Sequence, residues 1–127
     1  MALILDTSAL SALGDGDEGF LRLRENEPQL AIPAIVLGEY LYGIHQSRRR
    51  TIYEAWLKTA LPLFELLPVG SDCAEQYSEI RSELDEAGTP IPSNDLWIAA
   101  LARLHQMPVA TRDRHFRAVR GLRIVSW

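Results

Sequence analysis

Apolar positions along this chain follow two patterns: short unbroken runs, and longer stretches in which they recur every three or four residues. Unbroken runs are typical of strands buried on both faces, and recurrence every three or four residues is typical of amphipathic helices. The runs predict strands at residues 2–5, 29–32, 64–69, 108–111 and 122–125. The periodic stretches predict helices at residues 9–13, 20–26, 34–46, 48–61, 71–87, 96–104 and 113–118.

The predicted strands and helices alternate along the whole chain, which favours a parallel sheet flanked by helices. We therefore predict a three-layer α/β/α sandwich with a central, mainly parallel sheet of four or five strands. At 127 residues the chain is long enough for one well-packed core. No repeat or low-complexity linker divides the sequence, so residues 1–127 are expected to form a single domain.

Composition bears on whether the protein is membrane-bound, secreted or cytoplasmic. A hydrophobic fraction of 47% is ordinary for a soluble globular chain. No apolar run approaches the roughly 20 residues that a membrane-spanning helix needs, and the N-terminus lacks the basic segment of a signal peptide. The single cysteine, Cys73, excludes an internal disulfide and fits a reducing compartment. We expect a cytoplasmic protein with no membrane partner.

Charge is distributed unevenly. The net charge of −4 argues against a general nucleic-acid binder. From Leu101 onward, however, the chain carries six of its 13 basic residues, all arginines, and only one acid, Asp113. A basic segment on an acidic body suggests a local site for phosphate. A solvated arginine surface explains the same pattern equally well.

The first 13 residues hold the first candidate functional side chain. Residues 2–5 run unbroken into Asp6, and Thr7 and Ser8 precede the first predicted helix. Short polar side chains cap free backbone N–H groups at helix starts, so the stretch predicts a strand followed by a capped helix. Asp6 is therefore expected at the carboxyl end of a central parallel strand, where open α/β sheets place their ligands.

Two further acids lie on predicted helices. Glu39 has Ile35 and Val36 as helical neighbours, and Asp95 stands in the first turn of a very apolar helix, on the side of Ile98. A carboxylate on an apolar face is costly unless it is paired or binds a metal. The alternatives are that the first helix is rotated, so that Glu39 faces solvent, and that Asp95 only interacts with its helix dipole.

The last candidate acid repeats the pattern of the first. Asp113 belongs to the stretch VATRDRHF, in which an apolar strand is followed by threonine and then by an acid at a helix start. Taken alone, Asp113 is best explained as a helix N-cap, and Asp6 alone is ambiguous in the same way. Asp95 differs, because Ser93 or Asn94 is placed to cap its helix and a capping role for Asp95 is not required.

A functional role for the four acids is better supported when they are considered together. Asp6 and Asp113 lie just past strand ends at the same edge of a parallel sheet, and Glu39 and Asp95 lie on helices that must pack on that sheet. Four neighbouring carboxylates would repel and raise one another's pKa values, and a hard cation resolves that conflict. Oxygen ligands favour one or two Mg²⁺ or Mn²⁺ ions, and no His or Cys spacing suggests zinc.

An acidic cluster that holds divalent ions suits phosphodiester hydrolysis, because the ions activate a water and stabilise the in-line displacement. Such a mechanism needs no nucleophile from the protein. The sequence offers none, since it has neither a Gly-x-Ser-x-Gly motif nor a Cys–His pairing. It also lacks a glycine-rich phosphate loop.

At these residues the whole chain resembles the PIN-domain ribonucleases, and specifically the VapC-type toxins of bacterial toxin–antitoxin pairs. The resemblance rests on four segments in this order: LILDTSAL, PAIVLGEYLYGI, PSNDLWIAALA and VATRDRHF. It implies a PIN-like fold, Mg²⁺- or Mn²⁺-dependent cleavage of RNA, a homodimer, and inhibition by a cognate VapB-type antitoxin.

The resemblance also implies roles for individual residues. Asp6 and Asp95 would bind metal, and Glu39 and Asp113 would complete the catalytic, metal-binding site. Two further groups of residues are expected beside these acids. Supporting hydrogen bonds would come from Ser8 and Thr111, substrate phosphate contacts from Arg112 and Arg114, and structural packing from His115. An apolar groove for the antitoxin is expected to be lined by Leu10, Leu13, Phe20 and Tyr53.

Two other functions remain open on this sequence, and a third is contradicted by it. Asp-Thr-Ser also occurs in aspartic proteases, but those are all-β proteins and the helical periodicities at 34–46 and 71–87 argue against them. A metal-dependent phosphatase for small phosphoesters would use similar acids. A non-catalytic binding module, in which the acids are only helix caps, would bind neither Mg²⁺ nor Mn²⁺ specifically.

Overall fold

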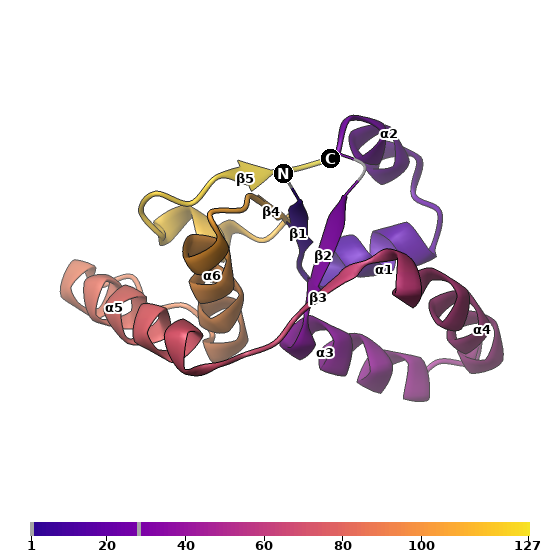
Figure 1. The fold of residues 1–127 in the computed structure, drawn as a ribbon, viewed down its shortest axis with the longest axis horizontal. Coiled ribbons are helices and arrows are strands. Elements are labelled where there is room, and N and C mark those ends of the chain that lie inside the picture. The colour runs from indigo at the N-terminus through magenta and orange to yellow at the C-terminus, as the bar shows by residue number, and fades with distance from the viewer. Residues whose placement is uncertain (1, 28) are drawn as a thin grey trace.

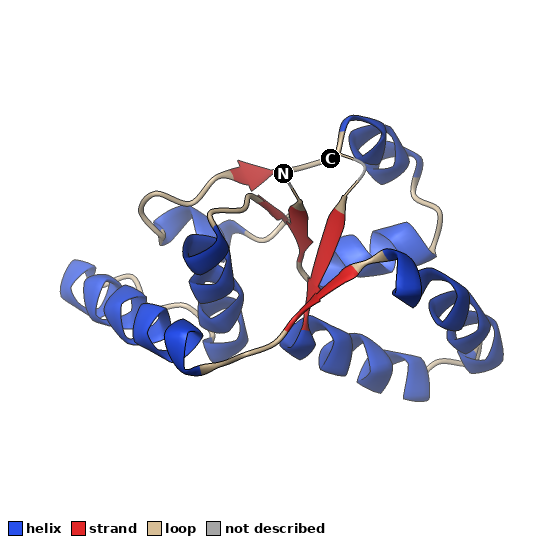
Figure 2. Ribbon diagram, viewed as in Figure 1, coloured by secondary structure: helices blue, strands red, loops and turns tan. Residues whose placement is uncertain are grey.

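The computed structural model describes residues 2–27 and 29–127, so positions 1 and 28 of the predicted domain lie outside the described residues. Within that part five strands form one sheet in the order β3-β2-β1-β4-β5, and every neighbouring pair is parallel (Figure 2). The strands are β1 (Leu3–Leu5), β2 (Leu30–Pro33), β3 (Glu65–Leu67), β4 (Val109–Ala110) and β5 (Ile124–Val125). The predicted parallel sheet is confirmed.

Six α-helices of the described residues flank the sheet on both sides (Figure 1). α5 and α6 lie together on one side, and α1 to α4 lie on the other. The helices are α1 (Thr7–Gly14), α2 (Glu18–Asn26), α3 (Ala34–His45), α4 (Arg50–Ala60), α5 (Ser71–Ala87) and α6 (Ser93–His105). Two short 3-10 helices follow α4 and β4, at Leu61–Leu63 and Arg114–Ala118. No helix in residues 2–27 and 29–127 is long and apolar enough to cross a membrane.

The strands occupy the predicted places but are shorter than the apolar runs. β1 and β2 are buried along their whole length, as unbroken apolar runs predict. β3 lies at the edge of the sheet and leaves Glu65 and Leu66 exposed. It ends at Leu67 because the residue opposite, Pro33, is where β2 ends and the chain turns into α3.

The strand order places a ligand-binding crevice at the centre of the sheet. From β1 the chain builds β2 and β3 on one side and then β4 and β5 on the other. Ligands in open parallel sheets bind at the carboxyl ends of the strands where this direction reverses. Here that point lies between β1 and β4, which pair through Leu5 and Ala110. The next residues, Asp6 and Thr111, therefore emerge side by side.

Two expectations about helices are wrong. α3 buries Val36, Tyr40 and Ile44, whereas Glu39 is exposed and so does not lie on a buried apolar face, and Tyr42 is 68% exposed. The sequence could not fix this rotation because α3 is apolar on most of its circumference. In α6 neither Ser93 nor Asn94 is the N-cap; that position is Pro92, and no side chain caps the helix.

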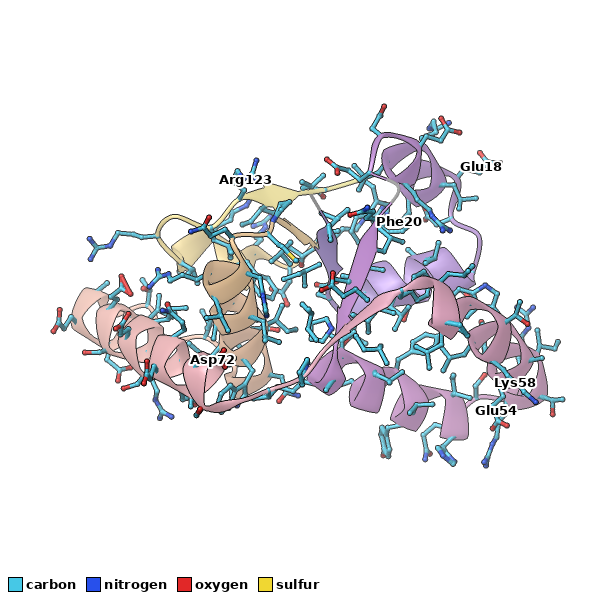
Figure 3. All side chains as sticks on the ribbon, in the orientation of Figure 1. Glu18, Phe20, Glu54, Lys58, Asp72 and Arg123 are labelled. Carbon is cyan, nitrogen blue, oxygen red and sulfur yellow. The ribbon has the colours of Figure 1, made fainter. Side chains whose placement is uncertain are left out.

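The predicted antitoxin groove is also largely wrong, because three of its four residues belong to the core. Leu10, Leu13 and Phe20 are all buried, and Figure 3 shows Phe20 between α2 and the sheet. Side chains such as Glu18 and Lys58 project outward instead. Only Tyr53, on α4, lines a surface pocket.

Gly14, the last residue of α1, is packed closely against two aromatic side chains. A Cβ at this position would lie 2.6 Å from the Tyr40 hydroxyl and 3.2 Å from the Trp56 ring. We expect Gly14→Ala to lower the free energy of unfolding by about 1–3 kcal/mol, measured by urea denaturation, because the aromatic rings must move. Gly38→Ala is the control: nothing lies within 4 Å of its Cβ position on α3, and it should stabilise by about 0.5–1 kcal/mol. Stabilisation by both substitutions would contradict this packing.

Candidate active site

Asp6 is held at the end of β1 by three hydrogen bonds. Its side chain is the N-cap of α1 and accepts from the Ala9 N–H at 2.8 Å and from the Ser8 hydroxyl at 2.7 Å. The Thr111 hydroxyl donates to its other oxygen. Asp6 is only 5% exposed, so these donors replace the water that its carboxylate loses on burial. Its capping role and its place in a functional site are therefore compatible.

Thr111 connects the ends of β1 and β4. Its side chain is 1% exposed, donates to Asp6 and accepts from the backbone N–H of Asp113 at 2.9 Å. Asp113 in turn caps the following 3-10 helix by accepting from the His115 N–H at 2.9 Å. This chain of bonds fixes Asp113 beside Asp6, as the shared edge of the two strands predicts.

Asp95 reaches the same place from the first turn of α6. Its Oδ2 lies 3.0 Å from Nδ1 of His115, and that nitrogen also lies 2.9 Å from Oδ1 of Asp113. His115 is therefore a member of the site, although the sequence suggested only structural packing for it. The signal that could have found it is its position two residues after an N-cap acid, which turns it back toward the strand end.

Burial and the neighbouring acids both change the pKa of the Asp95 carboxyl. Burial raises the pKa of the Asp95 carboxyl above its usual value, and repulsion from Asp113 and Asp6 raises it further. The hydrogen bond with His115 lowers the same pKa and only partly offsets the burial. As the pH falls, Asp95 therefore becomes protonated, and loses its negative charge for a cation, at a higher pH than an ordinary aspartate does.

All four predicted acids line one pocket of about 340 Å³, which we call the acid pocket. Its lining residues are Asp6, Thr7, Ser8, Glu39, Asp95, Ile98, Arg112 and Asp113. Glu39 is exposed at the edge, so α3 has the rotation that turns it to solvent, and its Oε1 accepts from the Thr7 hydroxyl at 3.0 Å. Arg112 lines the pocket, whereas Arg114 is exposed and is absent from its lining.

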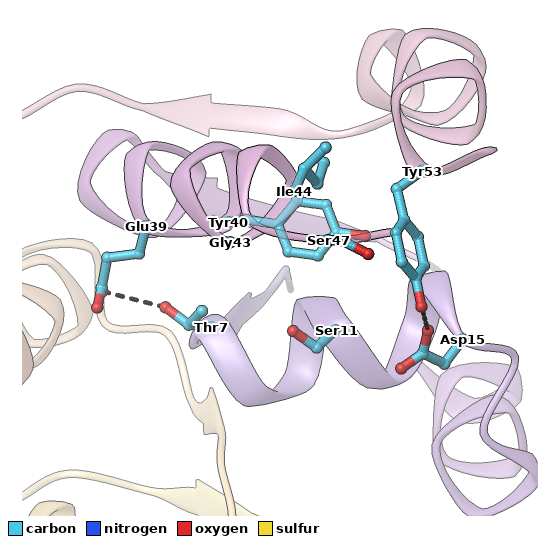
Figure 4. Close-up of a pocket in the computed structure, with 9 residues that line it drawn as sticks. All are labelled: Thr7, Ser11, Asp15, Glu39, Tyr40, Gly43, Ile44, Ser47 and Tyr53. Carbon is cyan, nitrogen blue, oxygen red and sulfur yellow. Dashed lines mark hydrogen bonds between the residues drawn. The ribbon is translucent and has the colours of Figure 1, made fainter. Parts of the chain in front are cut away.

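A second pocket of about 260 Å³ adjoins the acid pocket between α1, α3 and α4 (Figure 4). We call it the Tyr53 pocket; it shares Thr7 and Glu39 with the acid pocket. At its far end the Tyr53 hydroxyl donates to Asp15 at 2.7 Å. The buried Tyr40 hydroxyl has no hydrogen-bond partner among the described residues, and burial raises the pKa of Tyr40 to about 12.

The donor atoms of the acid pocket, together with His115 beside it, fit a divalent cation. One ligand atom from each of Asp95, Asp113 and His115 lies within 4.8 Å of the other two, and Asp6 and Glu39 line the same pocket. Clustered carboxylates repel unless a positive charge lies between them. Carboxylate-rich sets favour hard cations such as Mg²⁺ and Mn²⁺.

Comparison with known proteins identifies a family and several relatives to which this chain is similar. The family model of the PIN domain matches residues 3–122. Ribonuclease VapC2 of Rickettsia felis is 29% identical over 132 residues, covering 100% of this chain and 98% of its own length. Ribonuclease VapC5 of Mycobacterium tuberculosis is 33% identical over 123 residues, covering 93% of this chain and 87% of its own length. The crystal structure of VapBC2 from Rickettsia felis bound to a promoter DNA fragment is similar with a TM-score of 0.88 at 27% identity, covering 100% of this chain and 99% of that one.

Thr111→Val tests whether the Thr111 hydroxyl holds the site together. The substitution preserves shape but removes the hydrogen-bond partner of Asp6 Oδ2 and of the Asp113 N–H, while Ser8 and Ala9 still donate to the other oxygen of Asp6. We expect the free energy of unfolding to fall by about 1–3 kcal/mol, measured by urea denaturation with EDTA present. Thr59→Val is the control, because Thr59 is exposed on α4 and its hydroxyl donates at 3.3 Å to the carbonyl of Ala55; its effect should stay within about 0.5 kcal/mol. Equal effects of the two substitutions would contradict a special role for Thr111.

Proposed function

This chain belongs to the PIN domain family, and we propose that it is the endoribonuclease toxin of a toxin–antitoxin pair. The observation that carries the proposal is the convergence of Asp6, Glu39, Asp95 and Asp113 on one pocket at the carboxyl ends of β1 and β4. The relatives named as VapC ribonucleases align over nearly the whole chain. RNA is therefore the proposed substrate class, and hydrolysis of its phosphodiester bonds the proposed reaction.

The alternative functions account less well for the site. A module whose acids only cap helices explains Asp6 and Asp113, which are caps. It does not explain Asp95, which caps no helix, or Glu39, which lies in the middle of α3. A phosphatase for small phosphoesters would use similar acids, but the named activity of the relatives is that of ribonucleases. The parallel α/β sheet excludes the all-β aspartic proteases.

The mechanism that we propose uses fixed carboxylates and no protein nucleophile. Asp6, Asp95 and Asp113 would hold one or two Mg²⁺ or Mn²⁺ ions, with Glu39 completing the set from the pocket edge. When bound, such ions supply activation of a water and stabilisation of the charge that develops on the phosphate. Ser8 and Thr111 fix Asp6 by donating hydrogen bonds, so Asp6 needs little rearrangement before reaction.

We also propose that the Tyr53 pocket receives a segment of a VapB-type antitoxin. Figure 4 shows Glu39 at one end of this pocket and Asp15 at the other, which suits a peptide with basic side chains. Because the two pockets share Thr7 and Glu39, a segment bound here would obstruct access to the acid pocket. A homodimer that acts on RNA in the cytoplasm completes the proposal.

Asp6→Asn and Asp95→Asn test the catalytic assignment directly. Each removes one negative charge from the acid pocket at nearly constant shape. We expect both variants to lose cleavage of total bacterial RNA by at least about 100-fold with Mn²⁺ present, while circular dichroism shows an unchanged fold. Asp85→Asn, at an exposed position on α5, should cleave like the wild-type chain. Cleavage by the wild-type chain in EDTA, or cleavage at the wild-type rate by either site variant, would contradict the assignment.

Thermal unfolding tests ion binding without requiring activity. An ion that binds only the folded site stabilises it by about 2.7 kcal/mol at roughly 100 times its Kd. We expect Mn²⁺ to raise the melting temperature of the wild-type and Asp85→Asn chains but not of Asp95→Asn. Burial raises the pKa of Asp95, so the stabilisation should shrink as the pH falls through that pKa and the carboxyl becomes protonated. A melting temperature that ignores millimolar Mn²⁺ at neutral pH would count against the site.

A further inference from the structure

We propose that Arg112 binds a phosphate of the RNA at the acid pocket and that Trp127 positions it there. This inference rests on the proposed ribonuclease function and assigns phosphate recognition to a specific pair of residues. It assigns the phosphate contact to Arg112 and not to Arg114, although the sequence suggested both.

Sheet register brings Arg112 and Trp127 together across 15 positions of the sequence. β4 and β5 are parallel and pair Ala110 with Val125. Arg112 lies two residues after Ala110, and Trp127 lies two residues after Val125. The two therefore emerge opposite each other at the carboxyl edge of the sheet. Arg112 is thereby fixed next to Asp113 and the acid pocket.

Trp127 holds the Arg112 guanidinium through two contacts. The Nε–H of Arg112 donates to the Trp127 carbonyl at 3.1 Å, and the guanidinium carbon lies 4.6 Å from the centroid of the Trp127 ring. The ring itself is anchored, because it packs edge-on against the buried Phe20 ring with centroids 5.2 Å apart. A planar guanidinium stacked on a fixed aromatic ring loses little further freedom on binding a ligand.

The remaining donors of Arg112 are available to a ligand. Its two terminal nitrogens make no hydrogen bond and no ion pair with any residue in the described part of the chain, although four carboxylates line the same pocket. Free of Trp127, a guanidinium would pair with these acids and neutralise the proposed ion ligands. When the Arg112 guanidinium is held on Trp127, its two terminal nitrogens can donate a bidentate pair of hydrogen bonds to an anion, and that geometry matches phosphate.

Arg114 provides a matched comparison. It lies two residues away on the 3-10 helix, is exposed like Arg112, and does not line the acid pocket. General electrostatic attraction to RNA would be weakened equally by the loss of either arginine. A specific phosphate contact would be lost only with Arg112.

The first experiment compares Arg112→Gln with Arg114→Gln. The substrate is the RNA segment that spans the main cut made by the wild-type chain in total RNA. We expect Arg112→Gln to raise KM about 10-fold or more and Arg114→Gln to change it less than about twofold. In the non-cleaving Asp95→Asn background, fluorescence anisotropy should show that Arg112→Gln lowers the salt dependence of RNA affinity by about 0.7, the slope of one phosphate contact on a single strand.

The second experiment tests whether Trp127 acts through Arg112. Trp127→Leu should raise KM about as much as Arg112→Gln, and Trp127→Phe should restore it because an aromatic face is kept. The double variant Arg112→Gln/Trp127→Leu should be no worse than Arg112→Gln alone. A merely structural tryptophan would lower activity by the same factor in both backgrounds, and circular dichroism at the assay temperature shows whether Trp127→Leu stays folded.

The outcomes distinguish this inference from the function on which it rests. Absence of any metal-dependent RNA cleavage by the wild-type chain would overturn both. If cleavage is lost in Asp6→Asn, but Arg112→Gln changes KM no more than Arg114→Gln does, the Arg112 assignment alone is overturned. Additive effects of Arg112→Gln and Trp127→Leu would overturn the positioning role of Trp127.

Discussion

The candidate site depends on the buried hydrogen bond from Thr111 to Asp6. Parallel pairing of β1 with β4 makes this bond possible, because Leu5 and Ala110 are opposite each other and the next residue on each strand leaves the sheet at the same edge. The bond orients Asp6, and the second contact of Thr111, with the N–H of Asp113, positions the next acid. The strand order that reverses direction at β1 supplies the crevice into which both carboxylates open.

Electrostatic balance explains how so many acids can share one pocket. Asp6 is stabilised by three neutral donors, Glu39 by the Thr7 hydroxyl, and Asp95 and Asp113 share one imidazole nitrogen of His115. Arg112, the only cation lining the pocket among the described residues, is held on Trp127 and does not pair with them. The arrangement therefore keeps the carboxylates close together without neutralising them, which is the state that a divalent cation requires.

The sequence predicted the strands, the helices and the shared edge of Asp6 and Asp113, because short apolar runs followed by polar capping residues have few other solutions in a parallel sheet. It failed where a helix is apolar on most sides: the rotation of α3, and hence the exposure of Glu39, depends on what α1 and α4 bury against it. Leu10 and Phe20 were misplaced for a related reason, since an apolar stripe looks the same whether it faces the core or a groove. His115 and the pairing of Arg112 with Trp127 depend on turn geometry and strand register, which local pattern does not encode.

The most direct test of the account is the position of bound Mn²⁺ in crystals of this chain, located by anomalous diffraction. We expect a peak in the acid pocket within about 2.0–2.5 Å of carboxylate oxygens from Asp6, Asp95 and Asp113, and its loss in Asp95→Asn. An anomalous peak outside this pocket, or none at millimolar Mn²⁺ and neutral pH, would contradict the claim that these acids converge to hold a catalytic ion.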